Sequence, residues 1–122
     1  MIFITACSNA GPANTTDRKK ADYIREIPGE NDTIPAAVAQ KGEVLISYSD
    51  CGTCHKEAVR SVGPAFKDIA RRYPVQRVYI DMLAQKVISG GSGSWGDAVM
   101  SKHPKVPLED AQTMVSYILS LK

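Results

Sequence analysis

The chain has 122 residues, of which 43% are hydrophobic and 23% are charged, as is typical of one small globular domain. No apolar run approaches the roughly 20 residues of a transmembrane helix, so we expect no segment that spans a bilayer. The formal net charge is +2, and the part of the chain after Ile34 carries 11 basic and 8 acidic residues. Such a small excess of positive charge does not make a duplex-binding surface, and we expect no nucleic acid partner.

Residues 1–7 form a short apolar stretch that ends at Cys7. The last four of them, Ile-Thr-Ala-Cys, resemble a bacterial lipobox, in which a small residue precedes a cysteine that becomes acylated. The stretch lacks a basic front and is shorter than the roughly 7–15 apolar residues of a normal signal core. A lipidated Cys7 would attach the protein to a membrane, and an incidental free cysteine in a tail is the alternative.

Residues 8–34 are rich in polar residues, glycine and proline, and they contain few apolar residues. Such a segment buries too little surface to offset the entropy lost on ordering, so it predicts a flexible tether. A weak cluster of Tyr23, Ile24 and Ile27 could pack locally against the domain. We therefore expect the folded domain to cover residues 35–122.

Helical periodicity runs through the whole of residues 35–122, and no segment shows the alternation of a β-strand. Proline at a first helical position predicts helices that open near Pro35, Pro64, Pro74 and Pro107. The side chains expected to face the core include Val38, Leu45, Phe66, Ile69, Val75, Val78, Met82, Leu83, Val87, Leu108, Ala111, Val115 and Ile118.

The third of these helices is expected to stop at Gly90, where glycine is a common residue after a helix. The run Gly90–Ser94 predicts an irregular loop rather than regular structure. The fold class is therefore all-α, with about four helices in one small domain. A domain of this size has a thin core, which a large bound apolar group would complete.

The strongest chemical signal in the sequence is Cys51-Gly52-Thr53-Cys54-His55. Two thiols separated by two residues can each bond one vinyl group of haem, and the adjacent histidine can then bind the iron. We therefore predict one covalently attached haem c, with Cys51 and Cys54 as its attachment points and His55 as an iron ligand.

Two other kinds of site share a Cys-x-x-Cys spacing. A zinc site needs four ligands, and the remaining candidates in this chain are Cys7 and His103, which lie far from the motif. A thioredoxin-like redox pair normally follows a strand in βαβ surroundings, which this sequence does not predict. Both alternatives are therefore weaker than haem attachment.

An iron-binding histidine is usually oriented by a hydrogen bond from its other ring nitrogen. The proline-fixed turn at Pro64 could aim a backbone carbonyl at His55, although a helix-opening proline is the simpler interpretation. The second axial ligand must come from farther along the chain, and Met82, Met100 and Met114 are the candidates. Methionine within a helix usually fills a core, so Met100 in its predicted loop is preferred, with His103 as the alternative.

From Gly42 to Lys122 the sequence resembles the small class I cytochromes c of bacteria. The matching stretches are Cys51–His55, Ser61–Ala70, Gly93–Gly96 together with Met100, and Tyr117–Ser120. The resemblance implies a cytochrome c fold in which Gly42 meets Tyr117 at a crossing of the first and last helices. It also implies that Pro64 supplies the carbonyl for His55, that Trp95 and Lys86 lie beside the haem propionates, and that Met100 is the distal ligand. Ser101 stands where the family often has proline, which predicts a looser segment and a weaker bond from Met100 to the iron.

The predicted activity is one-electron transfer by a six-coordinate haem, without substrate chemistry at the iron and thus without enzymatic activity. A histidine and methionine pair raises the reduction potential of haem relative to two nitrogen ligands. Transient docking on acidic redox proteins, such as an oxidase, reductase or dehydrogenase, would be favoured by the basic residues Lys56, Arg60, Lys67, Arg71, Arg72 and Arg77.

Haem attachment and the lipobox-like start together predict a location outside the cytoplasm, in the periplasm and tethered to a membrane. Two alternatives remain open from the sequence. The chain could be a fixed cytochrome module of a dehydrogenase complex, or a haem enzyme or gas sensor with an open sixth position.

Overall fold

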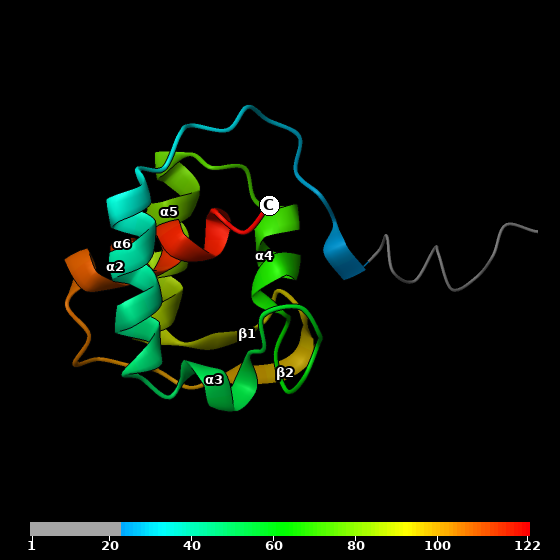
Figure 1. The fold of residues 1–122 in the computed structure, drawn as a ribbon. Helices are drawn as coiled ribbons and strands as arrows, with labels where there is room; N and C mark the ends of the chain where they lie inside the picture. The colour runs from blue at the N-terminus through cyan, green and yellow to red at the C-terminus, as the bar shows by residue number, and fades with distance from the viewer. Residues whose placement is uncertain (1–22) are drawn as a thin grey trace, which may run out of the picture.

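The computed structural model describes residues 23–122, which contain five helices of four or more residues and one two-stranded ribbon (Figure 1). The helices are α2 (Ala36–Ser47), α3 (Cys51–Cys54), α4 (Phe66–Arg72), α5 (Arg77–Ser89) and α6 (Leu108–Leu119). Strands β1 (Gly91–Gly93) and β2 (Gly96–Met100) lie between α5 and α6 in the chain. The predicted helical fold is confirmed, and the structure adds the one-turn helix α3 and the ribbon to the four helices expected.

Helices α2 and α6 cross at Gly42, which is buried in α2. A Cβ atom at this position would lie 2.7 Å from the Cβ of Tyr117 and would also collide with the backbone carbonyl of Thr113. The predicted contact between Gly42 and Tyr117 is therefore confirmed. The missing side chain lets the two helix backbones approach closely, and α3 follows α2 in the chain.

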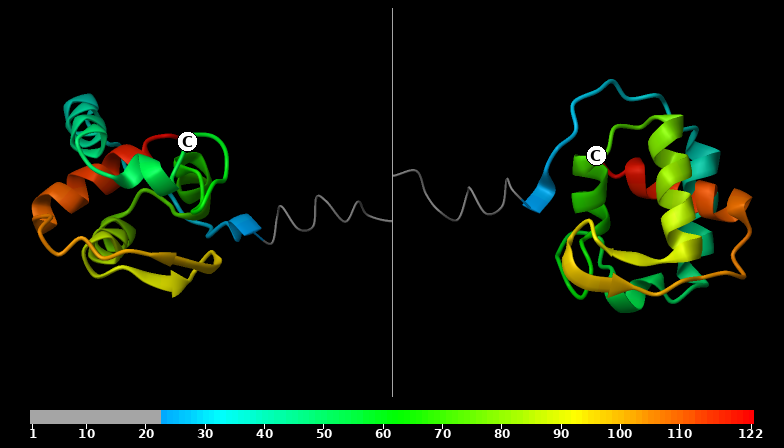
Figure 2. Two further views of the ribbon diagram at one scale, coloured as in Figure 1. Left: turned by 90° about the horizontal axis from the view of Figure 1, so that it is seen from below. Right: turned by 180° about the vertical axis from the view of Figure 1, so that it is seen from behind.

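Helix α6 is the central element of the core. Its residues Ala111, Val115 and Leu119 pack with Ala84 of α5 and with Tyr73 and Val75, between α4 and α5. A second buried cluster joins α2, α4 and α6 through Ile46, Phe66, Met114 and Ile118. Both clusters contain residues of α6, so this helix packs with α2, α4 and α5, which lie around it (Figure 2).

Four side chains that we expected to face the core are exposed instead. Val38 of α2 is exposed by 36%, Val78 and Met82 of α5 by 64% and 45%, and Leu108 at the start of α6 by 44%. The buried residue of α5 is Ala84, and Leu83 and Val87 turn inward beside it. The inward face of α5 is therefore rotated away from Val78, which the apolar periodicity alone did not reveal.

The prediction of an irregular loop at Gly90–Ser94, and of no strand, is wrong for this part of the chain. β1 and β2 pair as antiparallel strands, with Gly91 opposite Met100 and Gly93 opposite Gly96. The three glycines have positive φ angles of 144°, 96° and 93°, which residues with a side chain rarely adopt. The ribbon thus depends on glycine conformations rather than on alternating apolar residues, which is why no strand pattern is visible in the sequence.

Residues 23–34 run over one end of the domain from the side of α4 to the start of α2 (Figure 1). Ile24 is buried, and Ile27 and Ile34 pack against the core. The N–H of Ile27 donates to the carbonyl of Arg72, and that of Asp32 donates to the carbonyl of Val75, each at 2.8 Å. The division at residue 35 stays a prediction, but residues 23–34 contact the domain in the structure rather than standing free of it.

Cys7, the apolar stretch 1–7 and residues 8–22 of the predicted tether lie outside the described residues. Among residues 23–122, no helix is both long enough and apolar enough to cross a membrane.

Candidate haem site

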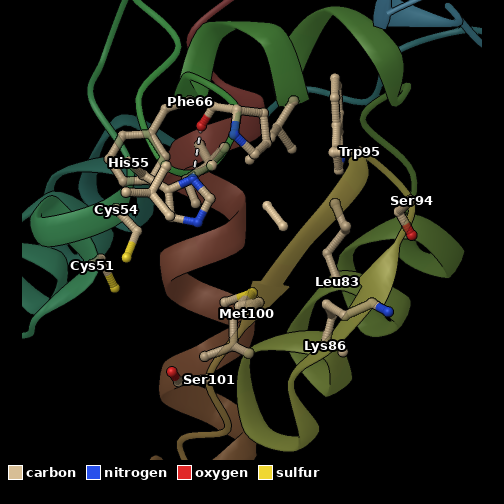
Figure 3. Close-up of a pocket in the computed structure, with 18 of the residues that line it drawn as sticks. Cys51, Cys54, His55, Phe66, Leu83, Lys86, Ser94, Trp95, Met100 and Ser101 are labelled. Carbon is tan, nitrogen blue, oxygen red and sulfur yellow. Dashed lines mark hydrogen bonds between the residues drawn. The ribbon is translucent and has the colours of Figure 1, made fainter.

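One pocket of about 490 Å³ opens between α3, α4, α5, α6 and the ribbon (Figure 3). Its wall is mostly apolar and includes Ile46, Phe66, Leu83, Val87, Val115 and Ile118. All seven residues that the sequence singled out also line this pocket, namely Cys51, Cys54, His55, Pro64, Lys86, Trp95 and Met100. Segments up to 49 positions apart are therefore assembled around one space.

Helix α3 presents the two cysteines of the motif at one side of the pocket (Figure 3). Both thiols are free and partly buried, and the hydroxyl of Ser49 donates a hydrogen bond of 2.9 Å to the sulfur of Cys51. The helix is a single turn, so residues 51 and 54 lie on the same face of it. Two thiols in this arrangement can bond two neighbouring points on the edge of one flat ligand.

His55 follows α3 directly and has the extended backbone angles φ −116° and ψ 127°. Its Nδ1 lies 2.7 Å from the carbonyl oxygen of Pro64, and its ring stacks on Phe66 with 5.5 Å between ring centroids. Because a carbonyl oxygen can only accept, Nδ1 carries the hydrogen and Nε2 keeps its lone pair. The contact predicted between Pro64 and His55 is present, and it leaves Nε2 as the nitrogen available to a metal.

Gly63 lies against the imidazole ring of His55. A Cβ atom on Gly63 would lie 2.7 Å from Cε1 of the imidazole, nearer than real Cβ contacts come. The N–H of Gly63 also donates a hydrogen bond of 2.9 Å to the carbonyl of Cys54. Residues 63 and 64 thus form one hydrogen bond each with the motif. Nothing in the sequence indicates this role of Gly63.

Met100 is the last residue of β2, rather than a loop residue as we expected. Figure 3 shows its sulfur across the pocket from the imidazole of His55. The backbone of Met100 lies close to Gly90, where an added Cβ would be 2.5 Å from the carbonyl oxygen of Met100. The lack of a side chain at Gly90 thus lets the two segments approach. Met82 and Met114 also line the pocket, but they come from α5 and α6.

His103, the alternative distal ligand, has both ring nitrogens engaged. Its Nε2 lies 2.8 Å from a carboxylate oxygen of Asp50, and its Nδ1 lies 3.2 Å from the carbonyl of Val87. These contacts bind the segment after Met100 to the residue before Cys51. The structure therefore gives His103 a bridging position at the edge of the pocket.

Trp95 and Lys86 lie on the side of the pocket away from the two cysteines (Figure 3). Lys86 stands in the last turn of α5, with its ammonium close to Gly91, where an added Cβ would lie 2.8 Å from Nζ. An indole N–H and an ammonium are both donors, and an ammonium attracts anions. This end of the pocket is therefore suited to negatively charged groups.

Arg72 is the residue that sequence reasoning misplaced. We expected it on a solvated basic surface, but it is 6% exposed, and its guanidinium lies 3.3 Å from the centre of the Trp95 ring. The pattern of α4 gave no sign of this, because Arg71 beside it is exposed and the two are alike in sequence.

The residues present fit a covalently bound haem. The pocket has the apolar wall that a porphyrin needs, two thiols on one edge, an imidazole nitrogen on one side and a thioether opposite it. No group of three or more His, Cys, Asp or Glu side chains that could hold a metal ion by themselves occurs in the described part of the chain.

Comparison with known proteins gives a consistent result. A family model described as cytochrome c matches residues 39–122. Cytochrome c-551 of Allochromatium vinosum is 39% identical over 87 residues, which are 71% of this chain and 90% of that protein. Cytochrome c-552 of Hydrogenobacter thermophilus is 34% identical over 87 residues, which are 71% of this chain and 88% of that protein. The crystal structure of wild-type Nitrosomonas europaea cytochrome c552 superimposes with a TM-score of 0.62 at 36% identity, covering 66% of this chain and 99% of that one.

Proposed function

Since the chain belongs to the cytochrome c family, we propose that it shuttles single electrons between redox proteins outside the cytoplasm. Like the family, it binds one covalently attached haem c and is a small electron carrier. When bound, the haem supplies an iron that alternates between the ferric and ferrous states. The observation that carries the proposal is the pocket itself, where His55 and Met100 stand on opposite sides of an apolar space.

We propose that Cys51 and Cys54 attach the haem. Each thiol would add across one vinyl group, with its sulfur bonded to one carbon and its hydrogen transferred to the other, so no oxidant is needed. Cys51→Ala or Cys54→Ala alone should weaken retention of haem after denaturing extraction, and the double variant should retain none. Cys7→Ser is the matched control and should retain all of it. Haem stain on a denaturing gel of the double variant would contradict this assignment.

We propose that His55 Nε2 and Met100 are the axial ligands of the iron. The hydrogen bond between Nδ1 and Pro64 supports this role, because it orients the ring and makes Nε2 a stronger ligand. Two bound ligands leave no open position on the iron, which suits electron transfer rather than substrate chemistry. The engagement of both nitrogens of His103 argues against that residue as the distal ligand.

We propose that Lys86 and Trp95 hold the propionates of the haem. Their donors lie at the end of the pocket away from the cysteines, where the carboxylates of an attached haem would come. The ammonium of Lys86 would compensate one negative charge, and the indole of Trp95 would donate one hydrogen bond. Lys86→Gln should lower the reduction potential, since the positive charge favours the ferrous state.

Two alternatives are each tested by a separate measurement. A haem enzyme or gas sensor would have an open sixth position, and the absence of proline after Met100 is the feature that favours it. An optical spectrum of the oxidised protein separates the cases: a sulfur-to-iron charge-transfer band at the red end indicates a closed carrier, and a five-coordinate spectrum indicates an enzyme or sensor. A fixed module of a dehydrogenase complex would instead co-purify with its partner at high salt, whereas a mobile carrier would not.

Docking on an acidic partner is supported by the exposed basic residues Lys56, Arg60, Lys67, Arg71 and Arg77. Rates of electron transfer to such a partner should fall as ionic strength rises, because screening weakens attraction between exposed charges. A rate independent of salt would contradict this mode of docking.

A membrane tether through Cys7 rests on the lipobox-like residues 4–7 alone. Expressed with an exporting signal sequence, the protein should partition with membranes, and Cys7→Ser should release it into the periplasmic fraction. Equal release of both forms would mean that the periplasmic carrier is not lipidated.

A further inference from the structure

Arg72 is a buried cation at the end of α4 that binds two distant segments of the chain. Its Nε donates to the carbonyl of Ile24, Nη2 to that of Tyr23, and Nη1 to that of Ser94, each at 2.6 Å. Tyr23 and Ile24 begin the described segment that crosses the domain, and Ser94 lies in the turn between β1 and β2. All three nitrogens of the guanidinium are thus used to hold one segment against the other.

The same guanidinium lies over the indole of Trp95, with Cζ 3.3 Å from the ring centre. Tyr23 packs on the indole edge-on, with 5.0 Å between centroids, and Arg60 covers Tyr23 at 4.2 Å. Trp95 therefore lines the pocket while its indole ring also contacts Arg72 and Tyr23. This places a fixed positive charge one aromatic ring away from the space for the haem.

No acidic side chain among residues 23–122 forms an ion pair with Arg72. Arg77–Asp81 and His103–Asp50 are ion pairs in this part of the chain, and Arg72 takes part in neither. A buried charge is costly unless it is fully hydrogen-bonded, so the three carbonyls and the indole face must hold their positions around it. A lysine could not replace this fork, because its ammonium has no planar set of donors.

We propose that Arg72 is a positioning residue for the haem edge, which locks Trp95 and the β1–β2 turn to the segment 23–34 and raises the reduction potential through its charge. The proposal rests on the assignment of Trp95 to the haem above. On this proposal, residues 23–34 help to hold Trp95 in its place in the pocket. A loss of the contacts between Arg72 and this segment would then also change the surroundings of the haem.

The test compares Arg72→Gln with Arg71→Gln in the haem-loaded protein. Arg71 is the exposed neighbour on the same helix, so both variants remove one positive charge from the same element. Arg72→Gln should lower the reduction potential by more than Arg71→Gln, because solvent screens the exposed charge. It should also speed hydrogen exchange at the Ile27 amide and in residues 91–96 by about tenfold or more, whereas Arg71→Gln should leave exchange unchanged.

Arg72→Lys separates the two effects and serves if Arg72→Gln does not fold. It should keep most of the potential and still show faster exchange, since the charge remains and the fork is lost. Faster exchange with a potential no lower than that of Arg71→Gln would overturn the link to the haem edge. Unchanged exchange in both Arg72 variants would overturn the positioning role. A failure of the proposed function is distinguished by the spectrum of the unmutated protein, which would then lack the band of a closed histidine and methionine pair.

Discussion

The carbonyl oxygen of Pro64 lies 2.7 Å from Nδ1 of His55, and Gly63, one residue earlier, touches the same imidazole. Because an added Cβ at Gly63 would lie 2.7 Å from Cε1, we expect Gly63→Ala to push the ring and stretch this hydrogen bond. The free energy of unfolding of the haem-loaded protein should fall by about 1–3 kcal/mol, the usual cost of overpacking. Denaturant unfolding followed by haem absorption measures this.

Gly52→Ala is the matched control for that variant. Gly52 lies within the attachment motif itself, but an added Cβ there would meet nothing within 4 Å. Alanine in place of glycine in a helix is neutral or stabilises by up to about 1 kcal/mol. Equal losses in both variants would mean that the loss at Gly63 does not come from the contact of its new Cβ with the His55 ring.

Met100→Ala should lower the reduction potential and open the iron to carbon monoxide. A thioether favours the ferrous state and blocks the sixth position, and axial ligands tune haem potentials over about 0.8 V. The drop in potential should be accompanied by loss of the sulfur-to-iron band. Voltammetry and a carbon monoxide difference spectrum measure the two effects.

Met82→Leu, Met114→Leu and His103→Ala are the controls for Met100. Leucine and methionine fill similar volumes, so the first two should cost less than about 1.5 kcal/mol and keep the spectrum. His103→Ala should also keep it at neutral pH, since that ring is bound to Asp50 and Val87. A changed ligand field in His103→Ala together with a silent Met100→Ala would reverse the assignment and indicate a haem with two histidine ligands.

The attachment motif and the helices could be predicted because both depend on local sequence. Cys51, Cys54 and His55 lie within five consecutive residues, and prolines precede α2, α4 and α6. The ribbon could not be predicted, because its pairing arises from glycine backbone angles that leave no pattern of side chains.

Arg72 shows a second limit of the sequence. Its burial depends on three carbonyls supplied by residues 22 to 49 positions away, and a carbonyl has no signature in the sequence. The composition of residues 23–34 predicted a flexible tether, because they contain few apolar residues. In the structure, packing by Ile24 and Ile27 and backbone hydrogen bonds hold this segment against the domain. Contacts made through backbone groups therefore could not be predicted from the composition of the sequence.

Gly42→Ala should destabilise the crossing of α2 and α6. The new Cβ would lie 2.7 Å from that of Tyr117 and would collide with the Thr113 carbonyl, so the helices must separate. We expect a loss of about 1–3 kcal/mol in the free energy of unfolding, although alanine is the better helix former. Gln40→Ala, on the exposed side of α2, should change it by less than about 0.5 kcal/mol. Helix dichroism during denaturant unfolding distinguishes the two.

Tyr23→Phe should leave the protein as stable at neutral pH or stabilise it by up to about 1 kcal/mol. The hydroxyl of Tyr23 is buried and has no hydrogen-bond partner in the described part of the chain, so its removal relieves a cost. The edge-on packing on Trp95 needs only the ring, which phenylalanine keeps.

The same variant should change the stability at alkaline pH. Burial raises the pKa of Tyr23 above its ordinary value of about 10, an effect partly opposed by the positive charge of Arg60. Since the unfolded chain then loses this proton at lower pH than the fold does, the stability linked to Tyr23 is full below about pH 10 and is lost as pH rises through the raised pKa. The advantage of Tyr23→Phe over the unmutated protein should therefore grow between about pH 9 and 11. Tyr48→Phe, at a position exposed by 89%, should show no such growth, and a parallel pH profile for both variants would contradict the burial of the Tyr23 hydroxyl.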